Sequence, residues 1–387
     1  MMRLEEPSFA PPPRGFALLN LGFRPFYLLA ALLAAASIAI WLAVYSGADW
    51  NGTLTPVLWH QHEMVFGFAL AVIAGFLLTA GRVWTGLPTP TGLPLALLAL
   101  HWLAARVLLY TGPEPLAAVV DGAFPFVLAA VMARVILGSR NARNYFVIVL
   151  LCALGAANVA FHLGHGALPV KAALYLVLTL VLVMAGRVVP AFTGSALPRV
   201  GVVRKPRLDY ASVAISVAAF AADLLNWDAR AVAVLALAAA VFHGIRQWGW
   251  RPLATRGRPI LWILHLSHAW FPAGFLLLAL SALGLAAPSA SIHAFGAGAI
   301  GGLIIGMITR TALGHTGRPL VAGRAETLAY VLVHIAAVLR VLAALAPGSG
   351  YSPLIALSGA AWVAAFLIYF ASYAPRLVSP RIDGKPG

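Results

Sequence analysis

Long apolar runs recur along the whole chain and are separated by short polar segments. Most runs are close to the ~20 residues that an α-helix needs to cross ~30 Å of hydrocarbon. A helix satisfies its own backbone hydrogen bonds in lipid, and the alternating pattern of a membrane β-barrel is absent from the sequence. The pattern predicts an all-α integral membrane protein with about twelve spans, at 23–46, 58–80, 93–110, 114–138, 144–166, 168–190, 207–226, 229–248, 259–286, 291–313, 325–346 and 351–373.

These spans divide the chain into a short N-terminal segment (1–22), a polytopic transmembrane domain (23–373) and a C-terminal tail (374–387). Composition supports this division, because 62% of the residues are hydrophobic and only 10% are charged. A water-soluble domain is nearer one half apolar and one quarter charged. The single cysteine, Cys152, excludes a disulfide framework, a cluster of thiolate ligands and covalent attachment of haem.

The net charge of +15 is a topology signal. All but four of the 26 Lys and Arg residues fall in segments on one side of the predicted spans, the four others being Arg106, Lys171, Arg230 and Arg340. By the positive-inside rule both termini are cytoplasmic, which requires an even number of spans. Nucleic-acid binding is rejected as the reason for the charge.

A possible internal repeat relates the second and tenth spans. A shift of 231 residues, the separation of His62 and His293, superposes Gly67 on Gly298, Gly75 on Gly306, and Thr85-Gly86 on Thr316-Gly317. The sixth span ends in a similar way around Arg187. Spans two, six and ten are four helices apart, which suggests three four-helix units of parallel orientation.

The chain has eleven histidines, most of them within spans or at their ends. Ionisable groups inside a membrane are expensive and favour a functional hypothesis, and imidazole is a common ligand of haem iron and copper. Five histidines collect toward the outer face, namely His60, His62, His162, His165 and His293. Isolated interfacial histidines can simply bond headgroups and water, but five from three spans favour a metal site.

Spacing constrains the roles of these five. His60 and His62 point to nearly opposite sides of a regular helix, so either the helix begins after His60 or the two serve different sites. Glu63 and Met64 share the face of His60. On the fifth span Asn158, His162 and His165 form one stripe, in which either histidine can be the ligand.

The other six histidines lie deeper or toward the cytoplasm. His265 and His268 share one face of the ninth span. His101, His243 and His334, each alone on its helix, are expected to make interhelical hydrogen bonds. The four ionisable residues in the outer parts of spans can pair with each other or with haem propionates, and are Arg106, Asp121, Asp223 and Arg340.

Span ten carries Gly298, Gly302 and Gly306 on one face at intervals of four. Such a face permits close helix packing, which is the main expectation. A flat cofactor lying against the glycines is the alternative.

Two long stretches of the chain form a specific pattern. The first is Leu58-Trp59-His60-Gln61-His62-Glu63-Met64-Val65-Phe66-Gly67-Phe68 with the following Ile73–Ala80 and Trp84-Thr85-Gly86. The second runs from His293 through Arg310 to Leu313-Gly314-His315-Thr316-Gly317-Arg318-Pro319-Leu320. Both stretches resemble the NnrS family, and the segment 158–162, a turn at Arg187–Pro190 followed by Phe192-Thr193, and His265 with Trp270 fit the same pattern.

The resemblance implies a bacterial inner-membrane protein containing haem and copper and associated with denitrification and the response to nitric oxide. The family's histidines match His60, His62, His162, His265, His293 and His315 here, whereas His268 is less typical. Our interpretation places one metal on His60, His62, His162 and His293, with Glu63 and Met64 nearby. A non-covalent haem b or second metal would involve His265, His315, Arg310 and Arg187.

The favoured function is therefore redox processing, binding or detoxification of nitric oxide, with an electron donor that the sequence does not identify. A membrane transporter for a metal, haem or a metal–nitrosyl species is the alternative, since many spans with internal repeats fit that class. A membrane scaffold with merely structural histidines is a third interpretation.

Overall fold

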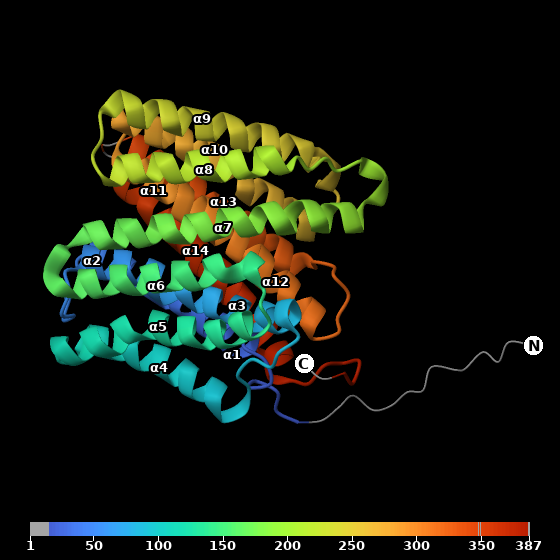
Figure 1. Cartoon of the computed structure of the whole chain (residues 1–387). Helices are drawn as coiled ribbons and strands as arrows, with labels where there is room; N and C mark the ends of the chain where they lie inside the picture. The colour runs from blue at the N-terminus through green and yellow to red at the C-terminus, as the bar shows by residue number, and fades with distance from the viewer. Residues whose placement is uncertain (1–14, 347, 349, 386–387) are drawn as a thin grey trace, which may run out of the picture.

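A computed structural model describes residues 15–346, 348 and 350–385 of the chain. In this part of the chain the fold is a bundle of twelve long helices with no β-strand (Figure 1). The elements in chain order are α1 (Phe23–Tyr45), α2 (Pro56–His62), η1 (Glu63–Ala69), α3 (Leu70–Thr85), α4 (Gly92–Thr111), α5 (Glu114–Gly138), η2 (Ala142–Asn144), α6 (Tyr145–Ala160), η3 (Phe161–His165), α7 (Ala167–Ala196), η4 (Pro198–Val200), α8 (Pro206–Leu224), α9 (Ala229–Gly249), η5 (Pro252–Thr255), α10 (Pro259–Ala282), α11 (Pro288–His293), η6 (Ala294–Gly301), α12 (Gly302–His315), α13 (Arg324–Leu345) and α14 (Tyr351–Val378).

The predicted all-α membrane fold is confirmed, and each predicted span corresponds to one long helix. Four spans are at least five residues longer than predicted, namely Pro56–Thr85, α7, Pro288–His315 and α14. α7 continues through Pro190 to Ala196, so the predicted turn at Arg187–Pro190 is wrong. The proline is accommodated within the helix, as neighbouring helices in a membrane protein allow. α14 continues to Val378, five residues past the predicted end of the transmembrane domain.

Eleven of the twelve helices are long and apolar enough to cross a membrane. The exception is α8, which carries Arg207, Asp209 and Asp223 within 19 residues. Its low hydropathy has a structural reason, because Ser212 and Ser216 are fully buried rather than facing lipid. The polar side of α8 is therefore turned into the protein.

The two described ends of the chain lie together at one end of the bundle (Figure 1). The Ala17 N–H donates a hydrogen bond to the Val378 carbonyl over 2.8 Å. This arrangement requires the even number of spans that the charge pattern predicts. The cytoplasmic location of this end stays a prediction, and residues 1–14 of the predicted N-terminal segment lie outside the described residues.

Three spans contain a stretch of π-helix, and two of these stretches occur at matching positions. η1 begins directly after His62, and η6 begins directly after His293, at the 231-residue shift seen in the sequence. The third stretch, η3, contains His162 and follows α6. Extended π-helix is rare and is found most often at functional sites. The matching positions agree with the suggested repeat, which stays a prediction.

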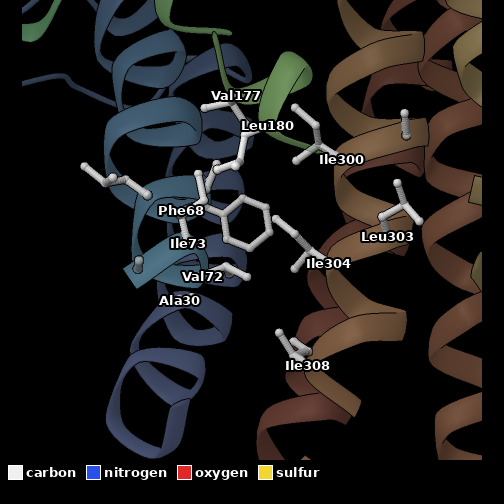
Figure 2. Close-up of a cluster of buried hydrophobic side chains, with 14 of the residues drawn as sticks. Ala30, Phe68, Val72, Ile73, Val177, Leu180, Ile300, Leu303, Ile304 and Ile308 are labelled. Atoms are coloured by element: carbon white, nitrogen blue, oxygen red, sulfur yellow. The ribbon is translucent and has the colours of Figure 1, made fainter. Parts of the chain in front are cut away.

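Apolar side chains join the two matching spans. Figure 2 shows Phe68 and Ile73 on one side facing Ile300 and Ile304 on the other, with Leu180 of α7 beside them. All five are buried. Because lipid is as apolar as these side chains, it is their close packing rather than the hydrophobic effect that holds the helices together.

The glycine face of span ten is filled by α10. A Cβ atom at Gly298 would lie 2.3 Å from the Trp270 ring, and one at Gly302 would lie 2.3 Å from the Ser267 hydroxyl oxygen. The glycine face therefore serves helix packing, which was the main expectation. A flat cofactor cannot lie against it, because side chains of α10 already occupy that space.

Candidate metal centre

The residues that could hold a metal gather at the end of the bundle away from the described termini (Figure 1). There α2 passes into η1 and α6 passes into η3, so both π-helical stretches border the same place. A π-helix has a wider turn than an α-helix and shifts the direction of the side chains that follow. His62 and His162 lie at these two transitions.

Two histidines and one aspartate bring their ligand atoms together. The Nε2 atoms of His62 and His162 lie 3.0 Å and 2.9 Å, respectively, from Asp121 Oδ2. The three ligand atoms lie within 4.8 Å of one another, the only such group among the residues described. His62 and Asp121 are buried, and the His162 side chain is 7% exposed. We call these three residues the His62–Asp121–His162 group.

Neighbouring polar residues fix the orientation of this group. Asn158 Nδ2 donates to Asp121 Oδ2 over 2.9 Å, so its Oδ1 atom is left to accept from His62 Nε2 at 3.0 Å. Arg106 donates to Asp121 Oδ1 and, over 2.9 Å, to Glu63 Oε1. Partners of this kind hold metal ligands in place and tune their basicity.

The charges of this region do not balance. Glu63 and Asp121 are buried carboxylates, and Arg106 is the guanidinium that pairs with both. With neutral imidazoles the sum is one negative charge, which is costly to bury without a partner. A cation bound by the imidazoles, either a metal ion or a proton, would neutralise it.

His60 and His293 do not join the His62–Asp121–His162 group. α2 begins at Pro56, so His60 is helical and points away from His62, and its ring stacks on Trp41 with centroids 5.1 Å apart. Of the two explanations for the His60–His62 spacing, the structure supports different surroundings for the two rings. The four-histidine site of our interpretation is thus divided in two.

His60 and His293 instead lie near Arg340. The Arg340 charge acts on both imidazoles, and His60 acts on His293. His293 Nδ1 donates to the Ser289 carbonyl over 2.7 Å, which leaves the Nε2 lone pair free. His60 Nδ1 and Arg340 Nη1 are buried without a hydrogen-bond partner among the described residues. These three residues form the His60–His293–Arg340 group.

The other outer-face residues have lesser roles. Glu63 belongs with Arg106, and its Oε1 atom lies 3.5 Å from His62 Nδ1. Met64 packs against the apolar core. His165 is exposed next to Gly164, whose φ of 88° ends the helix. Of the two candidates on that stripe, His162 is the one that reaches the centre.

The four residues predicted to bind haem separate into three places. His265 Nε2 contacts Thr193 Oγ1 at 2.8 Å, and Arg310 lies over the Phe192 ring at 3.8 Å, so both meet adjacent residues of α7. Arg187 donates to Asn144 Oδ1 over 2.9 Å. The His315 ring packs beside Phe23, with centroids 5.6 Å apart.

Histidines expected to make ordinary interhelical bonds do so. His243 Nε2 lies 2.9 Å from Ser216 Oγ, Trp270 donates to His334 Nδ1 over 3.1 Å, and His101 Nε2 lies 2.7 Å from the Val120 carbonyl. The ionisable residues of the outer spans pair partly as expected. Arg106 pairs with Asp121, whereas Asp223 forms an ion pair with Lys171 at 2.6 Å.

Asp121 and Asn158 were not among the predicted ligands, although both stood out in the sequence. Asp121 is the only acid within the apolar part of its span, and an intramembrane carboxylate is a functional candidate by default. Asn158 lies one turn before His162 on the same face. What the sequence could not show is that α5 carries Asp121 to the same depth as His62.

The chemistry of the donor set is that of a transition-metal site. Imidazole suits copper, iron and zinc, and two imidazoles with one carboxylate are the protein ligands of many non-haem iron(II) centres. The three-residue group can bind such an ion only after the proton between imidazole and carboxylate is released.

A family model described as NnrS protein matches residues 17–381 of the chain. No curated protein matches the chain.

Proposed function

Because the chain belongs to the NnrS family, we propose that it is a haem- and copper-containing protein of the bacterial inner membrane. In this proposal it binds or redox-processes nitric oxide, or relieves its damage, in denitrifying or nitrosatively stressed cells. The observation that carries the proposal is the His62–Asp121–His162 group with its unbalanced negative charge. Family membership by itself suggests only a membrane protein related to nitric oxide.

Copper fits the His62–Asp121–His162 group. The donors are two imidazole nitrogens and one carboxylate oxygen. A cation bound there offsets the one negative charge of Glu63 and Asp121 that Arg106 does not neutralise. Bound copper would supply a redox-active centre able to take nitric oxide as a ligand. Arg106 and Asn158 hold Asp121 so that Oδ2 is directed at both rings, which limits the reorganisation needed to bind the ion.

Haem b fits the His60–His293–Arg340 group better than the glycine face. His293 presents a free Nε2 atom, and His60 a buried nitrogen without a partner. Haem iron takes one or two imidazoles, and the unpaired Arg340 Nη1 is suited to a propionate. Bound haem would supply an iron centre for a diatomic ligand.

The surroundings suit a small apolar substrate. Nitric oxide dissolves in hydrocarbon, so it can reach a buried centre through lipid and needs no polar channel. Phe66 and Phe161 enclose His62, with ring centroids 4.9 Å and 4.7 Å away, which excludes bulk water. Turnover of nitric oxide would need an external electron donor, whereas binding would not.

The proposal is tested by metal content and optical spectrum of the purified chain. We expect a Soret band and bound copper in the wild type. Replacing His62 or His162 by alanine should lower the bound copper by one equivalent and keep haem, whereas His60→Ala or His293→Ala should remove haem and keep this copper. His165→Ala is the matched control and should change neither. A colourless, metal-free wild-type protein would refute the proposal.

One observation favours a transporter as the second candidate. Spans two and ten carry their π-helical stretches at matching positions, and transporters are commonly built from internal repeats with corresponding helices at the substrate site. A transporter would move copper or haem across vesicles at a rate that depends on the substrate gradient. The redox proposal requires no such movement, so vesicle uptake separates the two.

A further inference from the structure

Two buried histidines on α9 and α10 belong to neither group described above. His243 and His268 are both 0% exposed. Their ring centroids are 5.5 Å apart, a separation at which nitrogens that face each other can share one ion with bonds of about 2 Å. Each ring also has one nitrogen without a hydrogen-bond partner among the described residues.

The hydrogen bonds of Gln247 determine the protonation of His268. Gln247 Nε2 donates to the His265 carbonyl over 2.8 Å, so the atom 2.8 Å from His268 Nδ1 is the carbonyl oxygen, which only accepts. His268 must therefore carry its proton on Nδ1. The unpartnered Nε2 atom of the neutral ring therefore carries a lone pair and no proton.

Ser216 determines the protonation of His243 in the same way. The Ser216 hydroxyl has one proton, which it donates to the Ser212 carbonyl over 2.7 Å. Its contact with His243 Nε2 at 2.9 Å must then be one in which the imidazole donates. The unpartnered Nδ1 of His243 is the second bare lone pair.

His334 shows that this is not a general property of the buried histidines. Trp270 donates to His334 Nδ1, so the neutral ring carries its proton on Nε2. The unpartnered atom of His334 is an N–H group, which cannot bind a metal.

The surroundings of the two lone pairs are aromatic and dry. Phe271 lies against both rings, with centroids 5.9 Å from His243 and 5.4 Å from His268, and Trp250 and Phe275 cover the outer sides. Among the described residues, no carboxylate joins the two rings in a three-ligand group. Arg246 pairs with Asp209 at 2.8 Å, and Asp209 also pairs with the exposed Arg204 at 3.1 Å.

We propose that His243 Nδ1 and His268 Nε2 bind one copper(I) ion. Two neutral donors in a dry site favour a cation of single charge, because burying a second charge without a carboxylate is costly. Copper(I) is stable with two nitrogen ligands, whereas zinc and copper(II) require more. Ser216 and Gln247 act as positioning residues that hold each ring in the binding tautomer. This site is independent of the copper proposed on His62 and His162.

The test is copper(I) binding to the full-length protein in detergent, in a His62→Ala, His162→Ala background that lacks the outer site. The protein is stripped with a chelator and titrated under ascorbate against bicinchoninate as the competing probe. We expect one equivalent of copper, with an X-ray absorption edge typical of two-coordinate copper(I). His243→Phe and His268→Phe keep the aromatic packing and should each abolish binding.

The matched control is His334→Phe, which removes a buried histidine that has no free lone pair and should bind as the background does. Gln247→Met tests the positioning role without removing a ligand, and should weaken binding about 10–100-fold. If the His243 and His268 variants keep their copper, or the background binds none, the proposal is wrong. Loss of copper from the outer site alone leaves this inference untouched, so the two failures are distinguishable.

Discussion

Replacing Arg106 by leucine is expected to lower the free energy of unfolding by about 3–5 kcal/mol, the largest effect of any single change considered. Glu63 and Asp121 are 1% and 2% exposed, and Arg106 is the guanidinium that neutralises them. Removing it leaves two carboxylates close together in a site that water does not reach. Thermal or SDS-driven unfolding of the protein in detergent measures the change.

Charge, rather than loss of packing, should account for this effect. The double variant Arg106→Leu, Glu63→Gln restores the original net charge of the region and should recover part of the stability. Lys171→Met is a matched control, because it also breaks an ion pair to an aspartate, but Lys171 and Asp223 are 31% and 18% exposed. Water screens such a pair, so the expected cost is at most about 1 kcal/mol. Equal effects of the Arg106 and Lys171 variants would contradict the account.

Gly298→Ala is expected to destabilise the bundle by about 1–3 kcal/mol through overpacking. The added methyl would lie 2.3 Å from the Trp270 ring, at the contact between η6 and α10. That ring also donates to His334, so it cannot move away without losing a buried hydrogen bond. A lowered unfolding temperature is the measurement.

Gly296→Ala is the control for that change. Gly296 lies on the same π-helical stretch, two residues earlier, and a Cβ atom there meets nothing within 4 Å. The control should unfold at the wild-type temperature. If both alanine variants unfold at the same temperature, the close approach of α10 does not depend on Gly298.

The membrane fold could be predicted from the sequence because each span is a local pattern of length and hydropathy. The same applies to the shared end of the two termini, which follows from where Lys and Arg fall. α8 is the informative case, since its buried Ser212 and Ser216 reduce the hydropathy that reveals a span. Pro190 led to a predicted turn where the helix in fact continues. A proline that breaks a helix in water can be kept within one in a membrane.

The centre was only partly predictable, because it depends on relative depth. The spacing of His60 and His62 allowed different sites for the two rings, yet our interpretation placed both on one metal. The stripe on α6 contained His162 and left His165 as an alternative ligand. That Asp121 would meet both rings, and that His293 would lie with Arg340 instead, follows from helix packing at a distance in the chain. The π-helical stretches were missed because no shared composition marks them. Ala294–Gly301 is rich in glycine and alanine, whereas Glu63–Ala69 carries larger side chains.

We expect a copper ion to bind between His62, Asp121 and His162. An anomalous-difference map recorded at the copper absorption edge from crystals of the copper-loaded protein tests it directly. We expect a peak within bonding distance, about 2 Å, of both Nε2 atoms and of Asp121 Oδ2. A copper-loaded crystal with no peak among these three atoms would contradict it.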